Sequence, residues 1–163
     1  MKIIAVGRNY ADHAHELNNP IPLSPIIFMK PDTAVLKDNK PFYHPEFSTE
    51  IHHEIELVLK IAKEGKHIPP QFASNYFDEI SIGIDFTARD MQQKCKENAW
   101  PWELAKSFDH SAPVGRFISK TNFSDLYHIE FKLDINGHTK QHGNTQNLLF
   151  SFENIISFVS QHI

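Results

Sequence analysis

The stretch from residue 51 to 61 constrains the fold more than any other part of the chain, because its polarity alternates residue by residue. Ile55, Leu57, Leu59 and Ile61 fall on one face, and Glu54, Glu56, Val58 and Lys60 fall on the other. A period of two residues is typical of a half-buried β-strand. The sequence therefore predicts a strand over residues 51–61, around which the rest of the chain is organised.

Two acidic residues share the polar face of this predicted strand. Glu54 and Glu56 are two positions apart, which places their Cα atoms about 7 Å apart and lets their carboxylates converge on one cation. Oxygen ligands suit Mg²⁺, Mn²⁺ or Ca²⁺ better than zinc. His52 shares the face, so a His/Glu/Glu metal set is an alternative. A solvated face with two ordinary surface acids is the other interpretation, and this stretch alone favours it.

Length, composition and charge narrow the class of protein. The chain has 163 residues, of which 40% are hydrophobic and 22% charged, as expected for one globular domain. The net charge is −4 and no Lys/Arg run occurs, so there is no electrostatic footprint for nucleic acid or an anionic membrane. The single cysteine, Cys95, excludes an intrachain disulfide and fits a reducing compartment. No apolar run approaches membrane-spanning length. We expect a cytoplasmic protein.

Further periodic segments predict the remaining elements. Strands are expected over residues 2–6, 26–29, 79–85, 129–135 and 138–142, and helices over 10–17, 70–77, 87–98 and 151–161. Asn136-Gly137 is a strong hairpin signal, and Pro70 suits the first turn of a helix. Antiparallel strand signals mixed with short helices, with little βαβ rhythm, favour an α+β fold that is mostly β.

A second alternating segment ends near a third acid. Ile80, Ile82 and Ile84 are predicted to face the core, and Ser81, Gly83 and Asp85 to face the other way. Small residues on that face leave room for another group to approach the backbone. Asp85 lies at the predicted end of the strand, where functional residues are common. Thr87 and Asp90 have the spacing of a helix-capping pair, which leaves Asp85 free for another role.

A histidine and a glutamate share one face of the first predicted helix. Asn9 is a candidate cap for it, and His13 and Glu16 stand at i and i+3. A carboxylate beside an imidazole can orient it and raise its basicity, as a general base requires. The alternative is a surface helix that happens to carry these side chains together with His15.

One lysine stands among small and apolar neighbours near the middle of the chain. Lys106 lies within the segment Leu104-Ala105-Lys106-Ser107-Phe108. A buried lysine is costly unless a carboxylate or an anionic ligand lies beside it. We expect Lys106 to face a pocket and to find its partner in a substrate anion. Lys30, directly after the apolar strand 26–29, is a further pocket candidate, although such a lysine is more often exposed.

Five motifs, taken together, resemble the fumarylacetoacetate hydrolase family, and within it the small single-domain acylpyruvate hydrolases and oxaloacetate decarboxylases. They are Gly7-Arg8-Asn9-Tyr10-Ala11-Asp12-His13, Phe28-Met29-Lys30-Pro31, His52-His53-Glu54-Ile55-Glu56-Leu57, Asp85-Phe86-Thr87-Ala88-Arg89-Asp90 and Leu104-Ala105-Lys106-Ser107-Phe108. They follow in family order over nearly the whole chain. The resemblance implies one catalytic domain over residues 1–163. It also implies the mixed β-sandwich roll of the family's C-terminal domain, here without its last strands.

The resemblance also implies roles for individual residues. The metal ligands would be Glu54, Glu56 and Asp85, holding Mg²⁺ or Mn²⁺, with Ca²⁺ able to replace them in crystals. The catalytic residues would be His13 and Glu16, on a lid helix, together with Lys106. Lys106, Arg8 and Gln92 would bind substrate. The family further implies a homodimer.

The expected reaction is metal-dependent cleavage of a C–C bond. An acylpyruvate-type 2,4-dioxo acid would give pyruvate and a carboxylic acid, with oxaloacetate decarboxylation as a further reaction of the same site. An isomerase or decarboxylase of aromatic-acid catabolism is one alternative. An inactive metal-binding fragment is another, because the chain stops before a Thr-Gly-Thr-Pro segment that the family normally contains.

Overall fold

The computed structural model describes residues 1–10 and 21–163. Strands predominate over short helices, so the predicted α+β, mostly β class is confirmed. The chain divides into two compact units whose segments alternate along the sequence. The first unit comprises Met1–Ala5, Phe28–Val58 and Ser81–Arg116, and the second comprises Val6–Ile27, Leu59–Ile80 and Phe117–Ile163.

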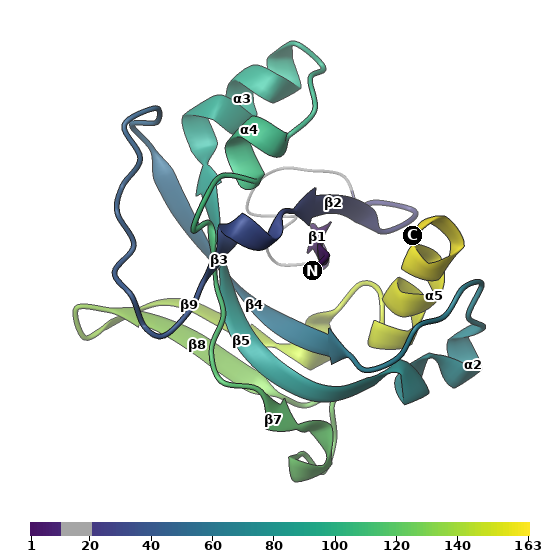
Figure 1. Ribbon diagram of the computed structural model, residues 1–163. Coiled ribbons are helices and arrows are strands. Elements are labelled where there is room, and N and C mark those ends of the chain that lie inside the picture. Colours follow the sequence, from purple (N-terminus) through teal and green to yellow (C-terminus); the bar gives the residue numbers. More distant parts are fainter. Residues whose placement is uncertain (11–20) are drawn as a thin grey trace. The chain divides into compact units, whose positions relative to one another are not determined.

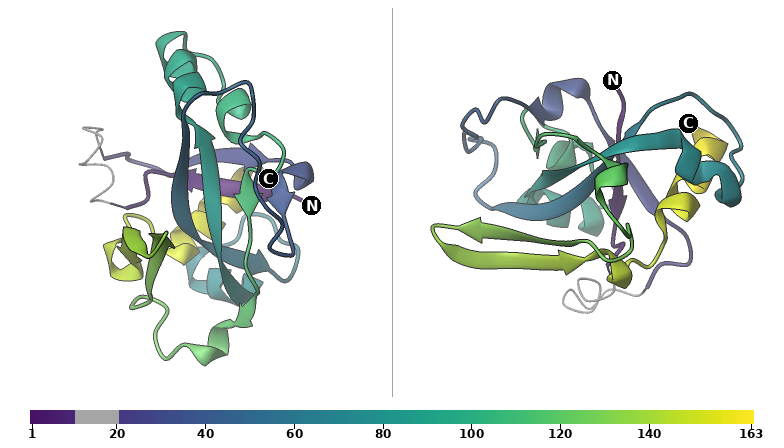
Figure 2. Two further views of the ribbon diagram at one scale, coloured as in Figure 1. Left: turned by 90° about the vertical axis from the view of Figure 1, so that its left-hand side faces the viewer. Right: turned by 90° about the horizontal axis from the view of Figure 1, so that it is seen from below.

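Two long neighbouring strands are the most prominent elements of the ribbon (Figures 1 and 2). They are β4 (Ile51–Ile61) and β5 (Phe77–Ala88), and with β7 (Ile118–Ser119) they form a sheet of order β4-β5-β7. The bounds of β4 are those predicted from its alternation. A separate two-stranded sheet pairs β1 (Ile3–Gly7) with β2 (Ile26–Lys30).

The first unit adds short strands and two helices to its parts of these long strands. A 3-10 turn, η1 (Asp32–Ala34), leads into β3 (Val35–Leu36), which pairs in parallel with β6 (Ala112–Pro113). Helices α3 (Arg89–Glu97) and α4 (Glu103–Lys106) lie side by side (Figure 1). The buried apolar side chains of this unit include Ala34, Leu36, Ala88, Cys95, Ala105 and Ala112.

The prediction of which β5 side chains are buried was wrong from Ser81 onward. Ile82 is 42% exposed, whereas Ser81 and Asp85 are buried. The small-residue face is covered because other backbone lies against it. A Cβ added to Gly83 would meet a Val58 methyl at 2.9 Å and the Pro113 carbonyl oxygen at 3.1 Å. Small side chains on this face therefore serve close packing.

The start of α3 also differs from the prediction. Thr87 does not cap the helix but lies inside β5, and its buried hydroxyl has no hydrogen-bond partner among the described residues. Asp85 accordingly lies three residues before the strand ends. The Asp90 carboxylate accepts hydrogen bonds from the Ser48 hydroxyl at 2.6 Å, the Thr49 amide at 3.1 Å and the Met91 amide at 2.8 Å. Through these hydrogen bonds Asp90 connects the segment before β4 to the start of α3.

The described residues of the second unit form a hairpin, two packed helices and three 3-10 turns. Strands β8 (Glu130–Ile135) and β9 (His138–Asn144) are joined through Asn136 and Gly137, both with positive φ, as the hairpin signal predicts. Helix α2 (Pro70–Ala73) packs beside α5 (Phe152–His162) (Figure 1). The turns are η2 (Ser74–Tyr76), η3 (Lys120–Asn122) and η4 (Thr145–Asn147). The buried apolar core includes Ile68, Ala73, Phe77, Ile80, Ile129, Phe131, Phe152 and Ile156.

The N-terminal prediction is only partly open to comparison. The Asn9 side chain accepts a hydrogen bond from the Phe150 amide at 2.8 Å and donates one to its carbonyl at 3.2 Å. The Asn9 side chain therefore binds a segment 141 positions away along the chain. The predicted helix over residues 10–17 lies almost wholly outside the described residues. In the part of the chain that the structure describes, no helix is long and apolar enough to cross a membrane.

Candidate functional site

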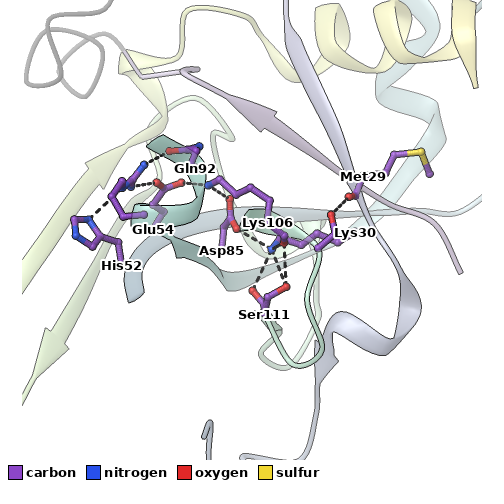
Figure 3. Close-up of polar contacts among 10 residues, drawn as sticks. Met29, Lys30, His52, Glu54, Asp85, Gln92, Lys106 and Ser111 are labelled. Atoms are coloured by element: carbon purple, nitrogen blue, oxygen red, sulfur yellow. Dashed lines mark hydrogen bonds and ion pairs between the residues drawn. The ribbon is translucent and has the colours of Figure 1, made fainter. Parts of the chain in front are cut away.

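A buried lysine of the first unit bridges two of the predicted metal ligands. Lys106 ends helix α4, and its ammonium lies 2.6 Å from Asp85 Oδ2 and 2.8 Å from Glu54 Oε2 (Figure 3). Lys106 is 3% exposed, and this burial agrees with the prediction from its apolar neighbours. The Phe28 ring lies on its other side, with its centroid 5.2 Å from Nζ. The expected partner was a substrate anion, whereas the partners in the structure are the protein's own carboxylates.

A second buried lysine approaches the same aspartate from strand β2. Lys30 Nζ lies 2.8 Å from Asp85 Oδ1 and donates a hydrogen bond to the Ser111 hydroxyl at 2.9 Å. It also contacts the carbonyl oxygen of Lys106. Burial lowers the pKa of Lys30, against the opposing effect of Asp85. The sequence offered a signal for this residue, a lysine directly after an apolar strand, but sequence reasoning regarded such a lysine as more often exposed.

Arg89, which sequence reasoning did not single out, occupies the other edge of the cluster. Its Nη2 donates to Glu54 Oε1 at 2.6 Å, and its Nη1 donates to the Gln92 side-chain oxygen at 2.5 Å. Its Nε donates to His52 Nδ1 at 3.3 Å (Figure 3). Gln92 is buried, one helical turn after Arg89, and it binds the same guanidinium group as Glu54. The missed signal was the i, i+3 spacing of Arg89 and Gln92.

The surroundings of Glu54 and Glu56 shift the pKa values of these two acids in opposite directions. Burial and the charges of Asp85 and Glu54 raise the pKa of Glu56 well above its usual value. Burial also acts to raise the pKa of Glu54, but the charges and hydrogen bonds of Lys106 and Arg89 outweigh it and lower that pKa to about 2. Glu54 is therefore held ionised by its cationic neighbours, whereas Glu56 has an environment that disfavours its charge.

The three acids match a divalent cation in chemistry but not in their present arrangement. Among the described residues, no group of three or more His, Cys, Asp or Glu side chains is placed to hold a metal ion. Glu54 and Asp85 instead direct oxygens at Lys106. Asp85 Oδ1 is buried without a hydrogen bond of good geometry, facing only the Lys30 ammonium. Hard carboxylate donors suit Mg²⁺ or Mn²⁺ once their side chains turn, so the assignment of Glu54, Glu56 and Asp85 stays a prediction.

The other predicted site residues are His13, Glu16, Arg8 and, for the alternative metal set, His52. His13 and Glu16 lie outside the described residues. Arg8 belongs to the second unit, where its backbone has φ of 60°, and its substrate-binding role stays a prediction. Both ring nitrogens of His52 have protein neighbours, Arg89 and Glu50. A His/Glu/Glu metal set with His52 would have to displace them.

Sequence comparison places the chain in one protein family. Residues 2–163 match the family described as fumarylacetoacetate (FAA) hydrolase, C-terminal. A mitochondrial oxaloacetate tautomerase of Mus musculus is 40% identical over 161 residues, which cover 99% of this chain and 73% of the relative. A mitochondrial oxaloacetate decarboxylase of Dictyostelium discoideum is 39% identical over 160 residues, covering 98% of this chain and 73% of the relative.

A solved structure agrees with these sequence relatives. The fumarylpyruvate hydrolase of Pseudomonas aeruginosa, crystallised with Mn²⁺ and pyruvate, superposes with a TM-score of 0.93 at 32% sequence identity. The superposition covers 100% of this chain and 72% of that protein. Similarity at this level, over the whole chain, extends to the family and not only to the fold.

Proposed function

The chain belongs to the fumarylacetoacetate hydrolase family, and from this premise we propose that it is a divalent-metal-dependent enzyme of oxaloacetate-like 2-oxo acids. The observation that carries the proposal is the buried Lys106 ammonium, held between Asp85 and Glu54 with Lys30 and Arg89 beside them. Buried charges are costly to assemble. A cluster of this density supports a role in binding anions or stabilising charge that develops during a reaction.

The proposed reaction is enolisation of a 2-oxo acid. In oxaloacetate, loss of a C3 proton gives the enol tautomer, whereas breaking the C3–C4 bond releases CO₂ and leaves the enolate of pyruvate. Both routes place negative charge on the C2 oxygen. Lys106 and Arg89 supply fixed positive groups for that oxygen and for the adjacent carboxylate, and Gln92 offers an amide beside them. Tautomerase and decarboxylase activity therefore need the same groups.

We propose that Glu54, Glu56 and Asp85 hold the cation, Mg²⁺ or Mn²⁺. Such an ion, when bound, supplies positive charge to the keto and carboxylate oxygens of the substrate. For this chain the consequence lies in Lys106 and Arg89. When the Glu54 side chain turns toward the cation, Lys106 and Arg89 each lose a carboxylate partner that lies at 2.8 Å or less. Their N–H groups then become donors for a substrate anion, so charge neutralised within the protein is made available to the ligand.

Hydrolysis of acylpyruvates is a second candidate, favoured by the similarity to a fumarylpyruvate hydrolase. Water would attack the distal carbonyl, and the C–C bond would break to give a carboxylic acid and the pyruvate enolate. This route needs a base to deprotonate the water, the role that the family resemblance gives to His13 with Glu16. His13→Ala should therefore abolish acylpyruvate hydrolysis and spare much of any oxaloacetate decarboxylation. Equal loss of both activities would exclude a water-activating role for His13.

The experiment that tests the function is a substrate panel with and without metal. Purified protein is assayed with oxaloacetate, acetylpyruvate and fumarylpyruvate in Mg²⁺, in Mn²⁺ and in EDTA. The enol absorbance and the release of pyruvate are both followed. The proposal predicts metal-dependent conversion of oxaloacetate, with acylpyruvate cleavage as the additional activity of the second candidate. No metal-dependent turnover of any member of the panel would contradict both candidates.

A homodimer and a reducing compartment such as the cytoplasm complete the proposal. The dimer rests on the family resemblance, and sedimentation velocity tests it. The compartment rests on Cys95, a free and buried thiol, which needs no oxidising environment. The two sequence relatives described above are named as mitochondrial proteins, so imaging of the tagged protein is the direct test.

A further inference from the structure

We propose that His52 is a positioning residue that holds Arg89 in place when Glu54 turns away from it. The contact is read from the geometry of the first unit. Its effect on catalysis rests on the proposed function, in which Arg89 binds a substrate anion. The hydrogen bonds of the His52 ring described here go to Arg89 and Glu50, and not to Glu54, Glu56 or Asp85.

The Arg89 guanidinium is oriented by three contacts, one on each of its nitrogens. Nη2 binds Glu54, Nη1 binds Gln92, and Nε binds His52 Nδ1 at 3.3 Å. A long arginine side chain has many rotamers and loses them only where several contacts agree. Two of these contacts, to Gln92 and His52, do not involve a predicted metal ligand.

The hydrogen bond fixes the state of the His52 ring. Arginine only donates hydrogen bonds, so Nδ1 of His52 accepts and its proton lies on Nε2. That nitrogen faces the Glu50 carboxylate at 2.9 Å. A carboxylate behind an imidazole selects the tautomer and orients the ring. Glu50, His52 and Glu54 follow at intervals of two, on one side of β4 and the residue before it.

The contact between His52 and Arg89 matters most when Arg89 loses its contact with Glu54. If Glu54 turns to a cation, Arg89 Nη2 is released while Nε and Nη1 stay bound. Two remaining contacts keep the guanidinium plane in its present orientation, with the freed Nη2 directed at the place that Glu54 has left. Without His52, a single contact to Gln92 would let the plane rotate. His52 should therefore affect how tightly the substrate anion binds, and hardly affect the bond-breaking step.

Two variants separate the hydrogen bond from the mere presence of a side chain. His52→Ala removes the acceptor. His52→Asn restores one, because the Asn Oδ1 stands at the same number of bonds from the backbone as imidazole Nδ1. His53→Ala is the matched control, since the next residue of the strand directs its side chain to the opposite face.

The direct measurement is the ¹H–¹⁵N signal of the Arg89 Nε–H group, which requires no activity. The chain has three arginines, Arg8, Arg89 and Arg116, so the spectrum is simple, and Arg89→Lys identifies the signal by removing it. His52→Ala should shift this signal and speed its exchange with water. His52→Asn and His53→Ala should leave it close to that of the unmodified protein. An Arg89 signal that is unchanged in His52→Ala overturns the proposal.

The kinetic measurement uses whichever 2-oxo acid the unmodified protein converts. His52→Ala should raise KM about three- to tenfold, the scale of losing one ordinary hydrogen bond, with kcat changed less than about twofold. His52→Asn should recover most of the loss. An unchanged KM in His52→Ala, or equal loss in both His52 variants, also overturns the proposal. If the unmodified protein converts no 2-oxo acid, the proposed function has failed, and the Arg89 signal alone decides the contact.

Discussion

Two lysines pair with carboxylates of the long strands β4 and β5, one in buried and the other in exposed surroundings. In the first unit Lys106 contacts Glu54 of β4 and Asp85 of β5, and the Lys106 side chain is 4% exposed. In the second unit Lys60 of β4 contacts Glu79 of β5, and the Lys60 side chain is 54% exposed. The strands thus carry one buried charge cluster and one surface ion pair.

The difference between the two pairs is the physical reason for proposing a function for the buried one. A surface ion pair contributes little to the stability of the folded protein, so removing the pair changes that stability little. A buried cluster has a large desolvation cost, and removing one member leaves the others uncompensated. Such a cluster persists where its charges are needed, as in a site that exchanges protein partners for a ligand. Substitutions that test this contrast should have their largest effects in the buried cluster.

Asp85→Asn should show the largest difference in stability. Among the ion pairs of the described residues, Asp85 is the one carboxylate that contacts Lys30, so the change removes this partner. Lys106 keeps Glu54 as its carboxylate partner. We expect the free energy of unfolding to fall by about 3 kcal/mol, the scale for removing one partner of a buried ion pair. The matched control, Glu79→Gln, should cost about 0.5 kcal/mol or less. Urea unfolding measures both, and equal losses would remove the distinction between the pairs.

Lys106→Met should show the largest difference in activity. The substitution keeps the apolar stem and removes the charge that is proposed to face the substrate anion. We expect kcat/KM for the converted 2-oxo acid to fall by about two orders of magnitude, the scale of losing one preorganised charge contact. Metal affinity should change little, because lysine is not a ligand. Lys60→Met should keep normal kinetics, and near-normal turnover by Lys106→Met would refute the assignment.

Asp90→Ala should show a smaller effect that depends on pH. The hydrogen bond from Ser48, with those from the Thr49 and Met91 amides, lowers the pKa of Asp90 below its usual value. A lowered pKa stabilises the folded state above the unfolded value near 4, and that stability is lost as the pH falls through the folded pKa. The variant should be about 1 kcal/mol less stable at pH 7, with the difference shrinking below about pH 4.

The control for Asp90 is Asp134 of the hairpin. Asp134 accepts a hydrogen bond from Thr139 and pairs with Lys132 on a solvated surface. Asp134→Ala should leave the unfolding midpoint nearly unchanged at pH 7. An Asp90→Ala difference that persists undiminished at low pH would show that the carboxylate charge is not its source.

Elements with strong local signals could be predicted from the sequence. The strand over 51–61, the Asn136-Gly137 hairpin and the C-terminal helix match the structure within a residue or two. Alternation, turn chemistry and helical periodicity are properties of neighbouring residues, so they need no knowledge of the rest of the fold. The five motifs likewise identified the family, because each is contiguous and their order follows the chain.

Burial on β5 could not be predicted, because it is decided by what lies against the strand. The isoleucines of that strand indicated the core face, yet Ile82 is exposed and the small residues are covered. Val58 and the Pro113 carbonyl lie against Gly83. The sequence of neither segment indicates that this contact forms. Propensity and periodicity describe one strand, and tertiary packing overrides them.

For some residues of the buried cluster the sequence carried a signal, but their contacts could not be predicted. The neighbours of Lys106 indicated its burial, yet its partner Glu54 is 52 positions away along the chain. Lys30 was only a candidate, because a lysine after a strand is more often exposed. Arg89 was missed, because its three contacts come from β4 and from its own helix. Such contacts depend on how distant segments meet, which a single sequence does not specify.

The most direct test of the central claim is a Mn²⁺ titration followed by electron paramagnetic resonance. If the buried cluster is a cation site, the unmodified protein should bind one ion per chain. Glu56→Gln and Asp85→Asn should each abolish that binding, and Glu79→Gln should retain it. Absence of saturable binding in the folded protein would contradict the account. So would Mn²⁺ binding that survives loss of the Asp85 carboxylate in a variant shown by circular dichroism to remain folded.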